Sequence, residues 1–160
     1  MSGNICIFTR PIRTRKTTEL QDWTRKNTDV AGILTPDIGG KRILTDIGTD
    51  VSYEFELSSP SKDFLSVGRF HFSSEIIQKA QQILLNCIGA KWLIIDEVGK
   101  LEVESDSGLE PAISQIISLY KNNPPADSKL LLVIRDTLLD KAMNKYGLSD
   151  AQVINSLNSI

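Results

Sequence analysis

The sequence predicts an α/β fold in which a mixed, mostly parallel sheet carries helices on both faces. Three short apolar runs, within residues 4–9, 91–97 and 129–135, lack polar alternation, as strands buried on both faces do. Segments with apolar residues at helical spacing follow or separate these runs, and that alternation is typical of a parallel sheet. Between residues 31 and 72 the pattern changes to short alternating runs and glycine turns, which predicts an antiparallel insertion.

The chain begins with a predicted strand at residues 4–9 (NICIFT), followed by a basic stretch and a helix. The basic stretch, residues 10–18, has the sequence RPIRTRKTT. Residues 16–27 have the composition of a helix, and we expect its inner face to carry Leu20, Trp23 and Thr24. The Lys-Thr pair at positions 16 and 17 therefore falls at a strand-to-helix junction.

The middle third predicts strands of antiparallel character. Residues 31–38 and 41–47 flank Gly39-Gly40, a pair that tolerates the positive φ angles of a type I′ hairpin turn. Residues 51–57 alternate polar and apolar side chains and predict a further strand, and residues 64–72 predict one or two short strands.

The second half alternates helices and buried strands. Apolar residues at helical spacing predict a helix over about four turns after Ser73, which is a plausible N-cap. The remaining predicted elements are a strand at 91–97, a helix at 109–120, a strand at 129–135 and short helices at 136–146 and 149–157.

Length and composition fit one domain spanning residues 1–160, because 41% hydrophobic and 24% charged residues are ordinary for a globular chain. A net charge of -2 provides no global attraction to nucleic acid or membrane, although three of the seven arginines fall between residues 10 and 15. The apolar runs are too short to span a membrane, no leader pattern is present, and Cys6 and Cys87 have no partner spacing. We therefore expect a cytoplasmic protein with reduced thiols.

The strongest local motif is WLIIDEVGKLE at residues 92–102, a buried strand that ends in two acids. Strands of an open α/β sheet bind ligands at this end, and such a pattern is that of a Walker B motif. In that interpretation Asp96 holds magnesium through water, and Glu97 orients and deprotonates an attacking water. The alternative is a strand that ends at the surface with two solvated acids.

Lys16 and Thr17 match the end of a P-loop, whose pattern is Gly, four residues, Gly, Lys and Ser/Thr. Lys16 would contact the β- and γ-phosphates, and the Thr17 hydroxyl would ligate magnesium. The two glycine positions hold Arg10 and Arg15, with Arg13 between them. An ordinary helix start with a threonine near its cap is the alternative interpretation.

Together these motifs resemble a small nucleoside-triphosphatase family known from thermophiles and, in humans, as the cancer-related nucleoside triphosphatase. Members of that family typically carry GPPGVGKTT, TPE…GGKR, VGKYGVN and IIDEIGKME. The counterparts here are RPIRTRKTT, LTPDIGGKRI (34–43), SVGRFHFSSE (66–75) and IIDEVGKLE (94–102). Order and spacing agree over residues 4–146, so the resemblance covers nearly the whole chain.

The resemblance implies a RecA-like P-loop NTPase fold that hydrolyses ATP, GTP or another NTP to NDP and phosphate with Mg2+. It implies Lys16 and Glu97 as catalytic residues and Thr17 and Asp96 as metal ligands. It places Lys16 and Thr17 at the nucleotide, and the other candidate nucleotide-binding residues of this stretch are Arg10, Arg13, Arg15 and Thr18. Lys100 matches the family's GK without an assigned role, and a solvated lysine is its alternative. Arg135 is either a charge-stabilising finger in cis or a surface arginine.

All three glycines of the family's loop are arginines here, which gives two opposed expectations. Glycine lets the loop amides wrap closely around phosphate, so its loss should strain the loop or misplace Lys16. Guanidinium groups, however, bind phosphate oxygens well. The sequence thus favours a nucleotide-binding protein with weak or residual hydrolysis. The alternatives are a catalytically inactive binding or regulatory module, an RNA-phosphate-binding module, and a loop with merely solvated arginines.

Overall fold

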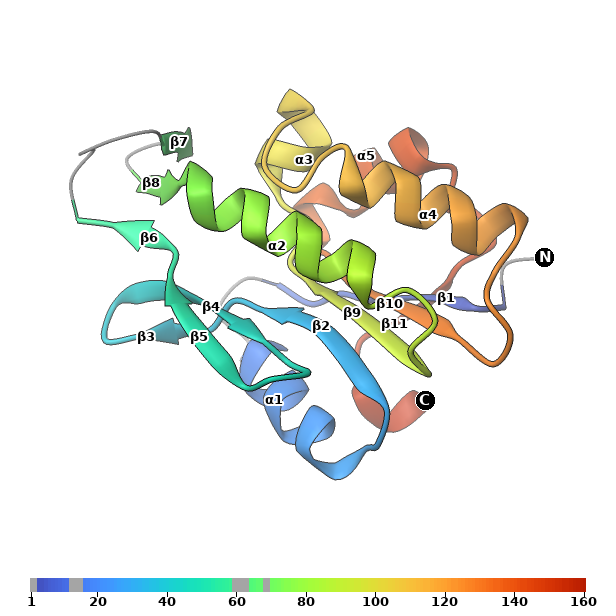
Figure 1. Cartoon of the computed structure of the whole chain (residues 1–160). Helices are drawn as coiled ribbons and strands as arrows, with labels where there is room; N and C mark the ends of the chain where they lie inside the picture. Colours follow the sequence, from blue (N-terminus) through green and yellow to red (C-terminus); the bar gives the residue numbers. More distant parts are fainter. Residues whose placement is uncertain (1–2, 12–15, 59–63, 68–69) are drawn as a thin grey trace.

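A computed structural model of the chain describes residues 3–11, 16–58, 64–67 and 70–160 (Figure 1). The strands are β1 (Ile5–Phe8), β2 (Val30–Leu34), β3 (Asp37–Ile38), β4 (Lys41–Asp46), β5 (Val51–Glu54), β6 (Glu56–Leu57), β7 (Phe64–Val67), β8 (Phe70–Ser73), β9 (Trp92–Asp96), β10 (Lys129–Val133) and β11 (Gln152–Ile154). The helices are α1 (Lys16–Lys26), α2 (Ser74–Asn86), α3 (Lys100–Ser105), α4 (Ala112–Asn122), α5 (Asp136–Tyr146) and the 3-10 turn η1 (Leu157–Ser159).

The main sheet is mixed and mostly parallel, as the sequence predicts. Its strand order is β11-β1-β10-β9-β2-β4-β3, and β5 also pairs with β4. The pairs from β11 to β2 are all parallel, whereas β2, β3 and β5 each pair with β4 in antiparallel fashion. One strand, β10, separates β1 from β9, which is the order of the RecA-like class.

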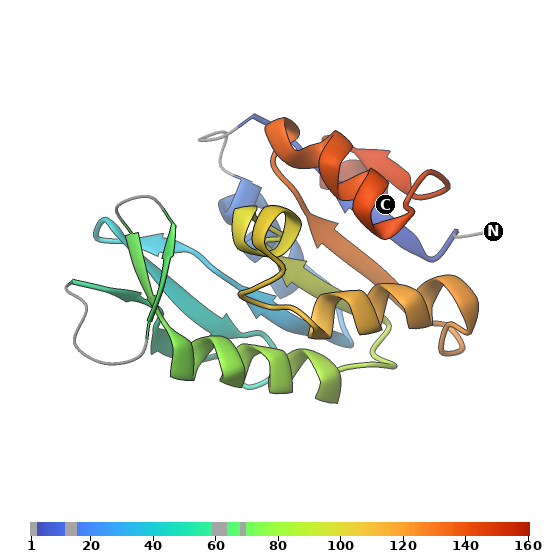
Figure 2. The same cartoon turned by 90° about the horizontal axis from the view of Figure 1, so that it is seen from above.

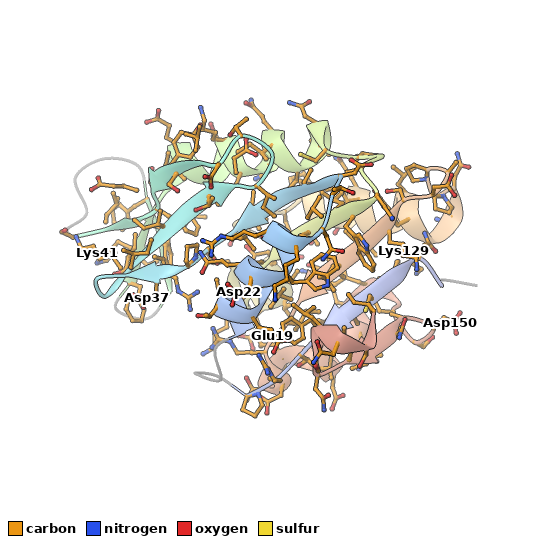
Figure 3. The ribbon with its side chains drawn as sticks, turned by 90° about the horizontal axis from the view of Figure 1, so that it is seen from below. Glu19, Asp22, Asp37, Lys41, Lys129 and Asp150 are labelled. Atoms are coloured by element: carbon orange, nitrogen blue, oxygen red, sulfur yellow. The ribbon has the colours of Figure 1, made fainter. Side chains whose placement is uncertain are left out.

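Helices cover both faces of this sheet, and each face has its own apolar core (Figure 1). Alternate residues of β9 serve the two cores: Leu93 and Ile95 face α2, α4 and α5, while Trp92 and Ile94 face α1 and η1. Figure 2 shows α2 and α4 lying across the first face, and Figure 3 shows α1 on the second. Among the described residues, no helix is long and apolar enough to cross a lipid bilayer.

The predicted antiparallel insertion is present. Gly39 and Gly40 have φ angles of 62° and 83° and join β3 to β4, as a type I′ turn requires. The segment predicted as one strand at 31–38 divides at Thr35 and Pro36: β2 belongs to the parallel core and β3 to the hairpin. The predicted strand at 51–57 divides at Phe55, and its second part, β6, joins β7 and β8 in a separate three-stranded sheet.

The helix predicted at residues 149–157 is wrong. Helix α5 ends at Tyr146 because the next residue, Gly147, has a φ of 62°, and the chain then adds β11 alongside β1. The backbone of β1 has an edge whose donors and acceptors β10 leaves unpaired, and β11 forms hydrogen bonds with it. The amide of Thr9 extends this pairing by donating to the Ile154 carbonyl at 2.9 Å. Helix α3, only six residues long, was not among the predicted elements.

Candidate functional site

The carboxyl ends of β1, β10 and β9 meet at one edge of the sheet, where an open α/β sheet binds its ligands. Asp96 is the last residue of β9, and Arg135 lies two residues beyond the end of β10. Lys16 is the first residue of α1, the helix that follows β1. The structure therefore brings the strand-to-helix junction and the paired acids to the same edge. Arg13 and Arg15 lie outside the described residues.

Two elements that are distant in the sequence meet at the Asp96 carboxylate. The Thr17 hydroxyl, from the first turn of α1, donates to Asp96 Oδ2 at 3.2 Å. The backbone amide of Thr35, just beyond β2, donates to the same oxygen at 3.1 Å. These bonds fix the carboxylate between the helix that begins at Lys16 and the antiparallel insertion.

Asp96 is 1% exposed, and its environment makes its negative charge costly. Burial, and to a lesser extent the negative charge of the adjacent Glu97, raise the pKa of this carboxyl to about 6. The hydrogen bond from Thr35, the positive charge of Arg42 and the hydrogen bond from Thr17 act in the opposite direction. A cation bound beside Asp96 would therefore stabilise the charged form of this carboxylate.

Arg42 is a site residue that the sequence did not assign. It lies on β4, and its Nη1 donates to the Thr35 carbonyl at 2.9 Å, so the hairpin carries a positive charge back toward Asp96. The GGKR segment was a signal in the sequence, but only the antiparallel return of β4 past β2 places the arginine here.

Glu97 forms an ion pair with Arg135. Arg135 Nη2 lies 3.2 Å from Glu97 Oε1, and the two side chains are 25% and 18% exposed. The predicted alternative of a plain surface arginine is therefore too simple, because this guanidinium lies against the candidate base. The Nε atom of Arg135 is buried without a hydrogen-bond partner among the described residues.

The loop that follows the acids is held by Glu102, another residue without a predicted role. Its Oε1 accepts from the Gly99 amide at 2.8 Å and its Oε2 from the Leu109 amide at 2.9 Å. Burial raises the pKa of Glu102, whereas these two amide hydrogen bonds lower it.

The loop is also joined to β10. The Val98 amide donates to the Val133 carbonyl at 2.9 Å. Lys100, which follows the loop, is exposed.

Arg10 lies against α1. Its Nη1 is 3.2 Å from Glu19 Oε1, and its guanidinium carbon lies 5.1 Å from the centre of the Phe8 ring. The other oxygen of Glu19 accepts from the Leu157 amide at 2.9 Å, so this ion pair connects the end of β1 to α1 and the C-terminal turn. Figure 3 shows Glu19 on the face of the sheet that α1 covers. Thr18 is exposed beside Thr17.

The donor set at Asp96 suits magnesium. Carboxylate and hydroxyl oxygens are the ligands this ion prefers, and Thr17 and Asp96 already place one of each 3.2 Å apart. Magnesium commonly takes only one or two protein ligands and completes its shell with water and phosphate oxygens. The described residues contain no cluster of three or more His, Cys, Asp or Glu side chains that could hold a metal ion.

The strand order, the strand-to-helix junction after β1 and the buried acid at the end of β9 define a RecA-like P-loop NTPase fold. A solved crystal structure, that of THEP1 from the hyperthermophile Aquifex aeolicus, has the same fold, with a TM-score of 0.71 and 17% sequence identity. The alignment covers 97% of this chain and 91% of that one, so it includes the insertion as well as the core. Comparisons with models of known families and with curated proteins found no match.

Proposed function

We propose that this chain binds a nucleoside triphosphate and hydrolyses it slowly to the diphosphate and phosphate with Mg2+. The observation that carries the proposal is the contact of 3.2 Å between the Thr17 hydroxyl and the Asp96 carboxylate. It joins the first turn of the helix after β1 to the buried acid of β9, in a fold that other P-loop proteins use for nucleotides.

In this proposal each residue at the carboxyl edge of the sheet has a separate role. Lys16, at the start of α1, binds the β- and γ-phosphates, with Thr18 beside it. Thr17 and Asp96 hold the magnesium, which supplies positive charge against the phosphate oxygens. Glu97 orients a water and accepts its proton as the oxygen bonds to the γ-phosphorus and the bond to the bridging oxygen breaks. The diphosphate leaves with the electron pair of that bond.

We expect turnover to be slow because the loop lacks the glycines of its relatives. Amides in a rigid loop are preorganised for the charge that develops during transfer, whereas an arginine side chain in general loses rotamer freedom when it binds phosphate. Arg13 and Arg15 would replace some of the missing amide contacts with charge-assisted bonds to phosphate. Arg10 would have to leave Glu19 to do the same.

The alternative is an inactive module that binds nucleotide, phosphate or a partner without turnover. The ion pair between Arg135 and Glu97 favours it, because the guanidinium already occupies one oxygen of the candidate base. An inactive module that binds nucleotide differs from the enzyme only in the release of phosphate, whereas one that binds phosphate or a partner differs in nucleotide binding as well.

The test combines binding with turnover. Purified protein with magnesium should show an upward shift of Tm with ATP or GTP, because a ligand of the native state stabilises it by mass action. Phosphate release should exceed that of a Lys16→Ala control. A Tm shift with no excess phosphate supports the inactive module, and the absence of any shift rejects nucleotide binding and with it the proposed hydrolysis.

The Arg15→Gly variant separates the effect of the loop from that of the site. If the arginines impair a working nucleotide site, this variant should bind ATP more tightly than the wild type. Equal shifts in both proteins would mean that the glycines are dispensable in this chain.

A further inference from the structure

Arg135 and Glu97 come from neighbouring strands and meet in a partly desolvated position. Their 3.2 Å contact joins the chain just beyond β10 to the chain just beyond β9, and water reaches only 25% and 18% of the two side chains. At this burial the attraction is screened much less than between exposed charges. The pair therefore fixes Glu97 in the ligand-free protein.

The ion pair conflicts with the role proposed for Glu97. A general base must reach the proton of a water within about 3 Å and must have a free lone pair to accept it. In this structure Oε1 of Glu97 is engaged by a guanidinium, which also occupies space beside the carboxylate. This oxygen of Glu97 becomes available to a water only when Arg135 changes its partner.

The backbones on both sides are fixed, so only side chains need to move. The Ile134 amide donates to the Phe8 carbonyl at 3.1 Å, and α5 begins at Asp136, directly after Arg135. The Val98 amide donates to the Val133 carbonyl at 2.9 Å on the other side. A change of partner by the guanidinium therefore requires no change in the sheet.

We propose that Arg135 is a gate that responds to the terminal phosphate: it holds Glu97 in the free protein and transfers to the γ-phosphate when a triphosphate binds. This inference rests on the proposed function of the same site. A terminal phosphate offers more negative charge than one carboxylate, and its oxygens match the fork of a guanidinium. The transfer frees Glu97 to accept the proton from water. A diphosphate lacks the group that draws Arg135 away, so Glu97 stays paired.

The test compares affinities for ADP and for AMP-PNP, a triphosphate analogue that is not hydrolysed, in the presence of magnesium. The proteins are the wild type, Arg135→Gln, Glu97→Gln and the double variant. Arg135→Gln should weaken AMP-PNP binding about tenfold or more, the effect of losing a charge-assisted bond, and change ADP binding less than about twofold. Arg135→Lys keeps the positive charge without the forked guanidinium, and its affinity for AMP-PNP should lie between those of the wild type and Arg135→Gln.

Glu97→Gln gives the sharper result. In the Arg135 background it removes the carboxylate that competes with the γ-phosphate, so AMP-PNP should bind more tightly. In the Arg135→Gln background the same change should have a smaller effect, and the difference between the two backgrounds isolates the ion pair. With ADP, Glu97→Gln should change the affinity by the same factor in both backgrounds.

A matched control is the exposed pair of Arg25 and Asp22 on α1, whose atoms are 3.5 Å apart. Arg25→Gln and Asp22→Asn should leave both affinities unchanged. If AMP-PNP and ADP respond alike to the Arg135 and Glu97 variants, the gate is rejected while the nucleotide site stands. If the wild type binds neither ligand, the proposed function fails and the gate fails with it.

Discussion

The Thr17 hydroxyl donates to the Asp96 carboxylate at 3.2 Å, although the two residues are 79 positions apart in the sequence. This bond joins the first turn of α1 to the end of β9 across the carboxyl edge of the sheet. The pair places one neutral and one anionic oxygen side by side, and Mg2+ prefers oxygen ligands of this kind.

Removing the Thr17 hydroxyl should abolish the effect of magnesium on nucleotide binding. Thr17→Val has the same shape without the oxygen, whereas Thr17→Ser keeps it. We expect the Tm shift with ATP and magnesium to fall in Thr17→Val to the shift seen in EDTA, and to persist in Thr17→Ser. The lost hydrogen bond should also cost about 1 kcal/mol of stability in the free protein. A magnesium-dependent shift that survives in Thr17→Val would reject Thr17 as a ligand.

Replacing Asp96 should stabilise the free protein at neutral pH. The folded-state pKa of about 6 lies above the ordinary value of 3.8, so folding favours the protonated acid. The stability from this protonation is complete below about pH 4 and is lost as the pH rises through about 6. At pH 7 the ionised Asp96 therefore costs the fold on the order of 3 kcal/mol.

In magnesium-free buffer, Asp96→Asn should accordingly raise the free energy of unfolding by a few kcal/mol at pH 7 and by much less at pH 4. Urea denaturation at the two pH values measures the difference. Asp22→Asn, at an exposed position of α1, is the control and should show no such pH-dependent gain. Equal gains from Asp96→Asn at both pH values would contradict the raised pKa.

The sequence predicted the parts of the site that depend on neighbours along the chain. A buried strand followed by Lys16 and Thr17 at a helix start, and a buried strand ending in Asp96 and Glu97, are local patterns. Their fold is confirmed by the strand order and by the likeness to THEP1. The strand β11 was missed because its three residues form a strand only beside the free edge of β1.

The remaining contacts depend on how distant segments return to the same edge. Arg42 reaches the site because β4 runs antiparallel past β2, and no local pattern fixes that register. Arg135 and Glu97 are 38 positions apart along the chain, and they meet because β10 pairs with β9 in the sheet. Glu102 is a charged residue whose burial follows from the folding of the loop around it, and charged side chains are expected on the surface.

Glu102 should prove to be a structural support of the acid loop. Each of its oxygens accepts one backbone amide, so Glu102→Gln places an NH2 group against one of those donors. We expect a loss of about 1–3 kcal/mol of stability, the cost of a buried donor left unsatisfied. Glu104→Gln is the matched control, because Glu104 pairs with Lys141 at the surface. Equal, small losses in both variants by urea denaturation would contradict the buried role of Glu102.

Gly32 should tolerate no side chain, because the strand that carries Asp96 passes directly beside it. A Cβ on Gly32 would lie 2.0 Å from the backbone carbonyl oxygen of Ile94, its partner in β9, and its φ of +121° is itself unfavourable for other residues.

Gly89 separates these two effects, since its φ is +102° but a Cβ there meets nothing within 4 Å. Gly89→Ala should cost about 1–3 kcal/mol, the price of backbone strain alone. Gly32→Ala should cost clearly more, because β2 and β9 must also separate. Urea denaturation measures both losses. The weaker pairing of β2 with β9 should also lower nucleotide affinity, in Gly32→Ala only, because the Thr35 amide that donates to Asp96 lies just beyond β2. Equal losses of stability in the two variants would mean that the strands adjust freely at this point.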